Sequence, residues 1–385
     1  MTTETFEKIG ISAALAAGLK KAGFVIPTGI QKKIIPLALL GMDIIAQSAT
    51  GTGKTLAYLL PLLQNLDADK REMQCLILVP THELAIQVQR QIEKIVEVSE
   101  SKIVSNPVIG NVNINRQIEK LKEKPHILVG TSGRVLELIQ KKKITSQTIK
   151  RIVLDEADRL LDDKNVDGVK AVIKTTLKER QIMLFSATIS PKTLERAQSL
   201  VHKPEVVMLA NENEEAPAIT HMYLVTEKRD KIEVLRKLVK LVDVRRALVF
   251  INKSDSTDEV AEKLIYHGVK AVSIHGRTIK NDRKKALEEF RKGKIQLLIS
   301  SDIAARGLDV NDIDYVFNLD LPENPEAYLH RVGRTGRAGK SGTAISIVTQ
   351  QELALIYKYE KVLKINIIAK IMEYGKISDK NTVLK

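Results

Sequence analysis

The stretch IVLDEADRLL, residues 152–161, joins a short apolar run to three carboxylates, those of Asp155, Glu156 and Asp158. A continuous apolar run of this length is typical of a strand that is buried on both faces of a parallel sheet. The carboxylates therefore fall where such a strand would emerge at the carboxyl edge of its sheet. Because like charges at this spacing repel one another, the pattern predicts that a cation binds among them.

Short apolar runs alternate with amphipathic stretches along the whole chain. Strands are predicted over residues 43–48, 74–80, 102–109, 126–130, 151–158 and 181–188, and again over residues 220–227, 246–252, 270–275, 295–301, 314–320 and 343–349. Helical periodicity covers residues 56–63, 82–99, 113–124, 228–242, 280–293 and 350–364, and a polar end follows. This alternation predicts an α/β fold with parallel sheets that are covered by helices on both faces.

A break in this pattern divides the chain. Residues 210–217, ANENEEAP, are acidic and polar and end in a proline, which is typical of a linker. A length of 385 residues favours two or three domains. We therefore expect an N-terminal domain over residues 1–208, a linker over 209–219 and a C-terminal domain over 220–385. A long surface loop is the alternative to a linker.

The composition is that of a soluble globular protein, with 44% hydrophobic and 28% charged residues. No apolar run approaches the roughly 18 residues of a membrane span, so no membrane contact is expected. The N-terminal segment carries Glu4 and Glu7 where a secretory signal would be basic, and the single cysteine, Cys75, has no partner for an intrachain disulfide. Cytoplasmic residence is therefore expected. Nothing in the pattern specifies the oligomeric state.

The formal net charge of +14 favours a polyanionic partner. Nucleic acid fits this charge, although many proteins with a basic balance bind none. The chain has no tryptophan and only 4% aromatic residues. Recognition of a nucleic acid is therefore expected to use the phosphate backbone more than the stacking of bases.

A glycine-rich loop, SATGTGKT over residues 48–55, lies between a predicted strand and a predicted helix. In this context, Gly51 and Gly53 would turn backbone N–H groups toward phosphate oxygens, and the helix N-terminus would add its dipole. Lys54 is expected to reach the β- and γ-phosphates, and Thr55 to bind Mg²⁺. The other loop residues expected to contact the nucleotide are Ala49, Thr50 and Thr52. The general motif has glycine in place of Ser48, and a glycine turn that merely begins a helix is the alternative.

The cation predicted at Asp155 is then Mg²⁺ bound with ATP. Asp155 would hold the metal through water, as the acid at the strand end does in P-loop ATPases. Glu156 is the candidate that orients and deprotonates the attacking water, and Asp158 is expected to pair with a neighbouring base such as an arginine. An acidic helix N-terminus is the simpler alternative, but it accounts for Asp155 alone.

The motifs, from Phe6 to beyond Arg337, stand in the order found in the DEAD-box RNA helicases, a family of superfamily 2 that this sequence resembles over about 350 residues. Residues 155–158 spell DEAD, and GFVIPTGIQ at residues 23–31 is similar to the Q motif of that family. The resemblance implies two RecA-like parallel-sheet domains in tandem, of the P-loop NTPase type.

For the Q motif, the resemblance implies three roles. Gln31 would hydrogen-bond the adenine edge, for which an amide is suited because it both donates and accepts. Phe24, with Phe6 upstream, would lie near the base, and Thr28 would support the loop.

HRVGRTGR at residues 330–337 resembles the arginine motif of the family. By that resemblance, Arg334 and Arg337 would reach the γ-phosphate as arginine fingers, and His330 would link the two domains near it. A solvated basic helix is the alternative for this motif when it is taken alone.

Two further motifs resemble those that sense the nucleotide. Ser186 and Thr188, in SAT after a predicted strand, correspond to the motif that couples nucleotide state to contact between the domains. In SDIAARGLD at residues 301–309, Gly307 would lie near the phosphates and Asp309 toward the ribose.

The positions that match the RNA-binding side of the family are spread over both halves of the chain. The residues expected to bind RNA are Pro80, Thr81, Glu83, Gly110, Thr131, Arg134, Gly276, Arg283 and Ser301. Five positions on this path depart from the family, namely His82, Asn111, Ser132, Lys280 and Ser301 itself, where the family has arginine, glycine, proline, glutamine and threonine. Two interpretations stay open. In the first, His82 packs within the protein and the charge of Lys280 replaces that of the missing arginine. In the second, the chain binds RNA more weakly or with a different selectivity.

The resemblance implies an RNA-dependent ATPase and RNA helicase. ATP and single-stranded RNA, held through its phosphates and 2′-hydroxyls, would together close the two domains and unwind short RNA duplexes locally and without processive movement. One alternative is an ATP-gated RNA clamp or annealing platform with little unwinding, and another is a DNA helicase of a different branch of superfamily 2. The sequence does not indicate which RNA is bound or in which pathway. A partner protein would be one way to select the RNA substrate.

Overall fold

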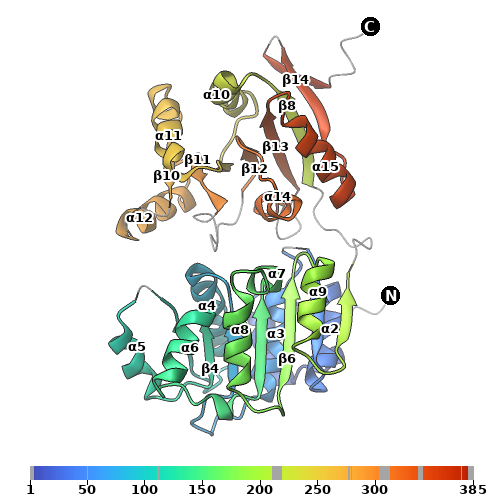
Figure 1. Ribbon diagram of the computed structural model, residues 1–385, viewed down its shortest axis with the longest axis vertical. Helices are drawn as coiled ribbons and strands as arrows, with labels where there is room; N and C mark the ends of the chain where they lie inside the picture. The colour runs from blue at the N-terminus through green and yellow to red at the C-terminus, as the bar shows by residue number, and fades with distance from the viewer. Residues whose placement is uncertain are drawn as a thin grey trace. The chain divides into compact units, whose positions relative to one another are not determined.

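The structure of the chain is a computed structural model, which describes residues 4–49, 51–110, 112–209, 219–275, 278, 280–302, 313–336, 341–373 and 375–379. The chain divides into two compact units, residues 1–214 and residues 215–385. Figure 1 shows the helices and strands of both units, each of which is described by itself.

The described part of the first unit contains a seven-stranded parallel sheet in the order β3-β4-β2-β5-β6-β1-β7. Its strands are β1 (Ile44–Gln47), β2 (Cys75–Leu78), β3 (Ser105–Val108), β4 (Ile127–Gly130), β5 (Arg151–Asp155), β6 (Gln181–Ser186) and β7 (Glu205–Met208). The sequence predicted the first six. It missed β7 because this edge strand is mostly exposed and has no buried apolar run.

Helices cover both faces of this sheet (Figure 1), because successive strand residues point to opposite faces. Ile77 and Val129 belong to one hydrophobic cluster, whereas their neighbours Leu76 and Leu128 belong to another. The first cluster is completed by α1 (Ala13–Lys21), α2 (Gly29–Leu39), α3 (Lys54–Asn65) and α4 (His82–Val98). The second is completed by α6 (Ser132–Gln140), α7 (Ala157–Leu160), α8 (Val166–Lys174) and α9 (Pro191–Gln198), and α5 (Ile114–Leu121) packs beside it.

The described part of the second unit contains an eight-stranded sheet in the order β10-β11-β9-β12-β13-β8-β14-β15, and every pairing except β14 with β15 is parallel. Its strands are β8 (Ile219–Val225), β9 (Ala247–Phe250), β10 (Ala271–Ile274), β11 (Leu297–Ser300), β12 (Tyr315–Asn318), β13 (Gly342–Val348), β14 (Ile368–Glu373) and β15 (Lys376–Asp379). The helices are α10 (Lys231–Leu241), α11 (Thr257–Tyr266), α12 (Lys280–Arg291), α14 (Pro325–Val332) and α15 (Leu353–Leu363). The predicted α/β fold with parallel sheets is thus confirmed in each unit.

The sequence predicted a polar end after residue 364 and gave no sign of the hairpin that the structure has there. Residues 368–379 form the hairpin of β14 and β15, in which Gly375 has a φ of 73° close to the turn. Both strands are at most partly buried, so the sequence shows only a weak alternation there. An exposed strand at a sheet edge has little apolar signal to read.

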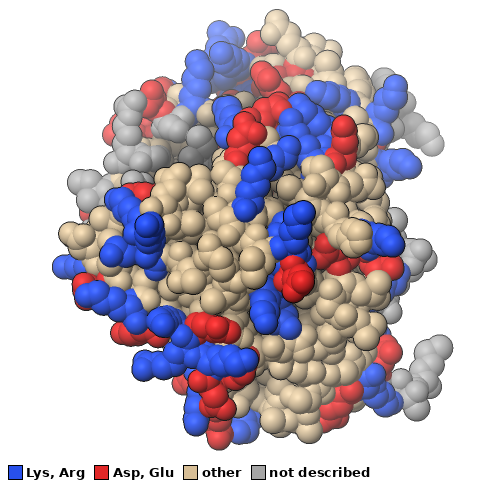
Figure 2. Space-filling view, turned by 60° about the horizontal axis from the view of Figure 1, so that its bottom comes forward, with Lys and Arg blue, Asp and Glu red and all other residues tan. Residues whose placement is uncertain are grey.

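Acidic and basic side chains are interspersed on the face of the molecule that Figure 2 shows, with uncharged areas between them. The net positive charge is therefore not gathered into a single basic patch on this face. Among the residues that the structure describes, no helix combines the length and the apolar character that crossing a membrane requires.

We expect His221 to make the stability of the second unit depend on pH. Its Nδ1 atom lies 2.9 Å from the Tyr328 hydroxyl, and burial lowers the pKa of the imidazole to about 4. The unfolded chain, with an ordinary histidine pKa, binds this proton more readily than the folded chain between pH 6.5 and 4. This contribution to stability is complete above that window and is lost as the pH falls through it, by at most about 1.4 kcal/mol per pH unit.

We expect His221→Gln to flatten the acid side of the stability profile. The measurement is the denaturant midpoint at neutral pH and near pH 5, compared with His202→Gln, which changes an exposed histidine. The variant should lose less stability on acidification than the wild type, whereas the His202 control should follow the wild type. Parallel profiles for all three proteins would exclude His221 as the source.

Candidate nucleotide and RNA site

The candidate site lies along the carboxyl edge of the first sheet. The glycine-rich loop follows β1, the acids follow β5, and Ser186 ends β6; these strands are neighbours in the order β5-β6-β1. Because the strands are parallel, their carboxyl ends share one edge. The structure therefore brings together three segments that are far apart in the sequence.

The glycine-rich loop bends back on itself before α3. Gly51 and Gly53 have φ values of 85° and 92°, which side chains larger than that of glycine rarely tolerate. The Lys54 ammonium donates to the carbonyl oxygens of Ser48 and Ala49 at 2.5 and 2.7 Å. The Ser48 and Thr52 hydroxyls are 2.7 Å apart, so Ser48, where the general motif has glycine, stabilises the loop from within. Thr50 lies outside the described residues.

The start of α2 braces this loop. The buried Gln31 amide accepts from the Thr28 N–H at 3.0 Å and donates to the Gly53 carbonyl at 3.1 Å. The Thr28 hydroxyl donates to the Thr52 carbonyl at 2.7 Å. A Cβ atom on Gly53 would lie 2.4 Å from Gln31 Nε2, so only glycine fits. Thr28 and Gln31 therefore both fix the conformation of the loop.

The two phenylalanines associated with the Q motif differ in exposure. Phe6 is buried in the core, with 3% of its surface exposed, so its ring is occupied by apolar neighbours. Phe24 is only partly buried at the edge of the same cluster, and the Lys94 ammonium lies 5.5 Å from its ring centroid. Of the two rings, that of Phe24 is the more accessible.

Asp155 is held on both oxygens. Tyr58 donates its hydroxyl to Oδ2 at 2.8 Å, and the Glu156 N–H donates to Oδ1 at 2.9 Å. Burial, together with the charge of Glu156, raises the pKa of Asp155 to about 6, and the charge of Lys54 acts in the opposite direction. The predicted convergence of loop and acids is thus visible in the electrostatics. Tyr58 was not predicted, because its only signal in the sequence is a polar hydroxyl inside an apolar helix.

Glu156 has an unusual backbone conformation for a residue with a side chain. Its φ and ψ are both 52°, in the left-handed region, and such conformations cluster at functional sites. Its Oε2 lies 3.7 Å from Arg159 Nε, and the side chain is 27% exposed. The conformation turns the chain sharply between β5 and α7, so that Glu156 remains accessible while Asp155 is buried.

Ser186 connects the loop to the last acid of the DEAD segment. Its carbonyl accepts from the Ser48 N–H at 3.1 Å, and its hydroxyl donates to Asp158 at 2.7 Å. The Ser186 hydroxyl is thus one partner of Asp158, and the basic partner that the sequence predicted for this acid stays a prediction. The Thr188 hydroxyl is buried and has no hydrogen-bond partner within the described residues.

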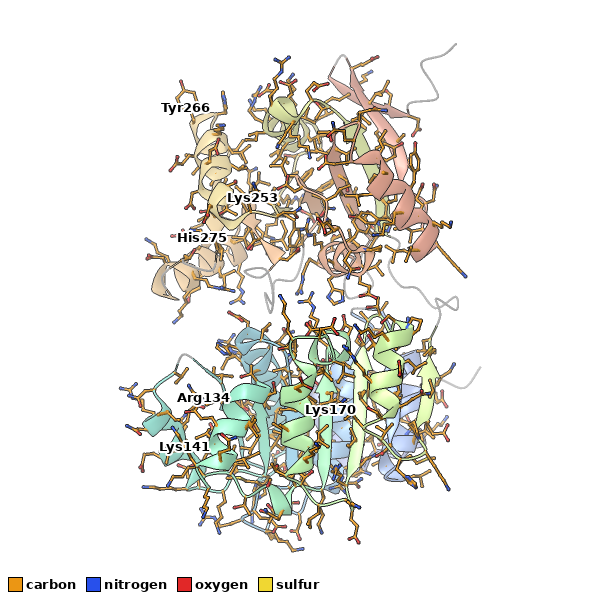
Figure 3. All side chains as sticks on the ribbon, in the orientation of Figure 1. Arg134, Lys141, Lys170, Lys253, Tyr266 and His275 are labelled. Carbon is orange, nitrogen blue, oxygen red and sulfur yellow. The ribbon has the colours of Figure 1, made fainter. Side chains whose placement is uncertain are left out.

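The segments matched to RNA binding follow β2, β4 and β3, on the other half of the same edge. Thr81 begins α4 and accepts from the Leu84 N–H at 3.2 Å, with Pro80 and Glu83 on either side. Thr131 begins α6. Arg134, which Figure 3 labels on α6, pairs with Glu137 at 3.0 Å.

His82 lies against Gly110. Its Nε2 atom is 3.0 Å from the position that a Cβ on Gly110 would take. The imidazole therefore packs on the end of β3 in the first turn of α4. Asn111, the next residue, lies outside the described part of the chain.

In the second unit, one described residue of the predicted site follows a strand end, and the others lie in helices or just after one. Ser301 is buried just after β11, His330 is buried in α14, Arg334 is half-buried after that helix, and Arg283 is half-buried in α12. Four predicted residues lie outside the described residues, namely Gly276, Gly307, Asp309 and Arg337.

Arg331 is the buried arginine of the HRVGRTGR segment, and the sequence analysis missed it. It is 1% exposed and forms a bidentate pair with Asp302 at 2.6 and 2.8 Å. It also donates to the Asp320 carbonyl and to Asn252 Oδ1. A solvated basic helix, the alternative for this motif, is therefore excluded at Arg331.

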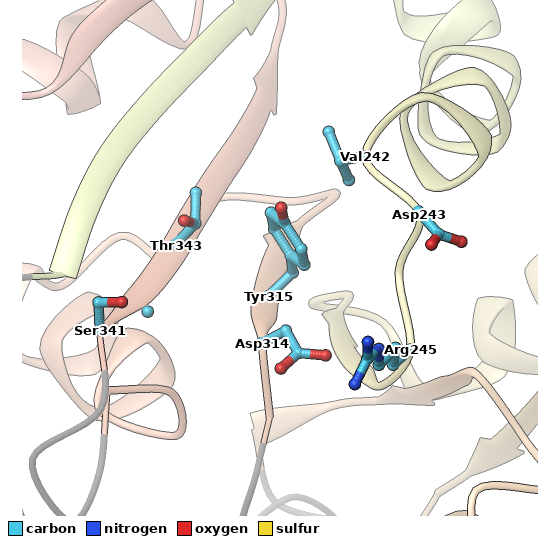
Figure 4. A pocket seen from close by; sticks show the side chains of 8 residues that line it. Val242, Asp243, Arg245, Asp314, Tyr315, Ser341 and Thr343 are labelled. Atoms are coloured by element: carbon cyan, nitrogen blue, oxygen red, sulfur yellow. The ribbon is translucent and has the colours of Figure 1, made fainter.

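A hollow of about 340 Å³ lies at the opposite, amino edge of the second sheet. Figure 4 shows its lining, with Asp314 and Tyr315 near the start of β12 and with Asp243 and Arg245 after α10. None of the residues predicted for the site lines this hollow.

The described residues contain no group of three or more histidine, cysteine, aspartate or glutamate side chains that could hold a metal. Magnesium bound with a nucleotide does not need one, because it is bound through one or two carboxylates together with substrate phosphates. The fixed Asp155 carboxylate fits that ligand set, and the glycine loop with the N-terminus of the 12-residue helix α3 fits the phosphates.

Comparisons with known proteins agree with this geometry. The DEAD/DEAH box helicase family matches residues 28–197, and the helicase conserved C-terminal domain matches residues 230–339. The chain is 41% identical over 346 residues to the DEAD-box ATP-dependent RNA helicase CshC of Bacillus cereus, which covers 90% of this chain and 88% of that protein. It is 41% identical over 359 residues to the probable ATP-dependent RNA helicase YfmL of Bacillus subtilis, covering 93% and 94%.

Solved structures share the fold. Saccharomyces cerevisiae Dbp5 bound to RNA and ADP BeF3 superposes with a TM-score of 0.86 at 30% identity, over 95% of each chain. A DEAD box protein from the hyperthermophile Methanococcus jannaschii has a TM-score of 0.58 at 35% identity, over 95% of this chain and 98% of that one. The predicted pair of RecA-like domains is thus confirmed, and the chain belongs to the DEAD-box family of ATP-dependent RNA helicases.

Proposed function

We propose that this chain is an RNA-stimulated ATPase that unwinds short RNA duplexes locally and without processive movement. One observation carries the proposal: the phosphate loop and the acids lie on β1 and β5, and the segments matched to RNA binding follow β2, β4 and β3 on the same edge. The RNA-bound structure of the related Dbp5 supports this assignment. Cytoplasmic residence and a protein cofactor belong to the same proposal.

ATP binds the first domain in this proposal. Gln31 uses one amide hydrogen and one oxygen lone pair within the protein, and an amide has two of each. It therefore keeps a donor and an acceptor for the adenine edge, with Phe24 near the base and Phe6 packed behind. The residues proposed to form the nucleotide site are Phe6, Phe24, Thr28, Gln31, Ala49, Thr50, Gly51, Thr52, Gly53, Lys54 and Thr55 of the first domain, joined by Gly307 and Asp309 of the second.

Thr55 and Asp155 are proposed to hold Mg²⁺, which would neutralise charge on the phosphate oxygens when it is bound. Lys54 exchanges its carbonyl partners in the loop for phosphate oxygens, so its ammonium keeps hydrogen-bond acceptors in both states. Glu156, accessible beside the buried Asp155, accepts the proton of the attacking water.

RNA is proposed to lie across the edge through its phosphates and 2′-hydroxyls. The residues proposed to bind it are Pro80, Thr81, Glu83, Gly110, Thr131, Arg134, Gly276, Arg283 and Ser301. The contact of His82 with Gly110 favours a packing role for His82, in place of the phosphate contact that an arginine would make.

The two domains, proposed as residues 1–208 and 220–385 with a linker at 209–219, close when ATP and RNA are both bound. Closure would bring Arg334 and Arg337 to the γ-phosphate and His330 close to it. The buried Thr188 hydroxyl supports a change of contacts at the SAT segment, because an unsatisfied buried hydroxyl costs about 1–3 kcal/mol that a partner in the closed form would recover.

Closure limits the length of duplex that one cycle can open. At about 1.4 kcal/mol per base-pair step, a figure for DNA, opening about six steps costs roughly 8 kcal/mol. One closure is able to offset a cost of this size but not that of a long duplex. Local unwinding follows, without tracking along the strand.

The proposal is tested by ATP hydrolysis with and without single-stranded RNA. Because arginine fingers contribute about 10³-fold or more in other NTPases, RNA should stimulate turnover by at least about tenfold, and DNA of the same sequence should not. Equal stimulation by both would favour a DNA helicase. Strand displacement and RNA off-rate on one short duplex separate the helicase from a clamp, which would hold RNA with ATP and displace no strand.

A further inference from the structure

The Tyr58 hydroxyl lies inside the first unit, next to the residues proposed to hold magnesium. Tyr58 is fully buried in α3 and its ring centroid is 5.2 Å from that of Phe185. Thr55 is three residues earlier in the same helix, a spacing that places both side chains on one face. Tyr58 donates its hydroxyl to Asp155 Oδ2 at 2.8 Å.

This hydrogen bond completes the restraint on the Asp155 carboxylate. The Glu156 N–H holds Oδ1, and Tyr58 holds Oδ2. A carboxylate restrained at both oxygens has one orientation, and each oxygen keeps a lone pair for a water molecule or a metal ion.

The hydroxyl of Tyr58 differs from other buried tyrosine hydroxyls in its partner. Tyr359, which is equally buried, donates to the backbone carbonyl of Pro322, a contact that only satisfies the hydroxyl. Tyr58 instead donates to the Asp155 carboxylate at the end of β5.

We propose that Tyr58 is a positioning residue whose hydroxyl fixes the Asp155 carboxylate in the orientation that binds magnesium together with the nucleotide. The inference rests on the proposed ATPase function and adds a residue to its metal site. The proposed role depends on the hydroxyl and not on the ring. Tyr58→Phe therefore tests it, because phenylalanine removes the hydroxyl and keeps the packing of the ring against Phe185.

The test is the magnesium dependence of nucleotide binding by the full chain. A fluorescent ADP analogue is titrated into wild type, Tyr58→Phe and the matched control Tyr359→Phe, at a series of magnesium concentrations and in EDTA. Removing a partner that orients a metal ligand typically costs 10- to 100-fold, so we expect Tyr58→Phe to need about tenfold more magnesium. Binding in EDTA should be unchanged, and the control should match the wild type.

A second variant separates positioning from general packing. In an Asp155→Asn background, Tyr58→Phe should have no further effect on the magnesium requirement, because the two residues act through one contact. The inference is overturned if Tyr58→Phe leaves the magnesium requirement unchanged, or if it weakens binding equally with and without magnesium. Failure of the wild type to bind the analogue at any magnesium concentration would instead overturn the proposed function itself.

Discussion

Replacing Glu156 by glutamine should lower RNA-stimulated ATP hydrolysis by about 10²- to 10⁴-fold, the usual contribution of a general base. Glutamine has the same shape as glutamate but does not accept a proton from water at neutral pH. The Glu156 N–H that holds Asp155 belongs to the backbone, so the substitution leaves that restraint in place. The loss should therefore fall on turnover and not on binding.

Steady-state turnover at saturating ATP and RNA measures this effect, and the affinities for both ligands are measured beside it. Glu119→Gln is the matched control, because it changes an exposed glutamate that forms a surface ion pair with Lys122 at 2.8 Å. Unchanged turnover in Glu156→Gln would remove Glu156 from the role of base. Loss of ATP binding in this variant would show that its effect lies before the chemical step.

The convergence of the glycine loop and the acids could be predicted from the sequence because both follow apolar strands. In a parallel sheet, every strand places its carboxyl end on the same edge. The order of the strands could not be predicted in this way. The pairing of β1 with β6 joins Ile45 to Leu184, and no local pattern records a contact over that separation.

The residues that the sequence analysis missed have partners far away in the chain. Tyr58 stands in an apolar helix, and nothing nearby in the sequence points to Asp155. In the sequence, Arg331 is one of several basic residues in the same motif and nothing distinguishes it from them. Its partners Asp302 and Asn252 are 29 and 79 residues away. Residue type gives the chemistry that a side chain is capable of; only the tertiary fold gives its partner.

Loss of the Arg331 side chain is expected to lower the stability of the second unit strongly. Its guanidinium joins the ends of three strands, through Asn252 after β9, Asp302 after β11 and the Asp320 carbonyl after β12. The guanidinium carbon also lies 5.1 Å from the Phe250 ring centroid. These strand ends carry the segments proposed for RNA and nucleotide contacts, so loss of Arg331 affects both stability and activity.

Arg331→Met should lower the free energy of unfolding by about 3 kcal/mol, the lower end of the range for breaking a buried pair, because Asp302 remains 33% exposed. For a unit of this size, that loss corresponds to a fall of roughly 6 to 12 °C in its thermal midpoint. Arg331→Lys should recover part of it, because lysine restores the charge but not the planar fork. The matched control is Arg236→Met, which breaks an ion pair with Glu233 near the surface and should cost less than about 1 kcal/mol.

The double variant Arg331→Met with Asp302→Asn identifies the cause of the loss. If the cost of Arg331→Met comes from an aspartate left without its counter-charge, neutralising Asp302 should restore part of the midpoint. If the cost comes from the lost hydrogen bonds to Asn252 and the Asp320 carbonyl, the double variant should be no more stable than the single one. A single variant as stable as the wild type would mean that the strand ends hold their positions without Arg331, and the account of this motif as a structural anchor would be wrong.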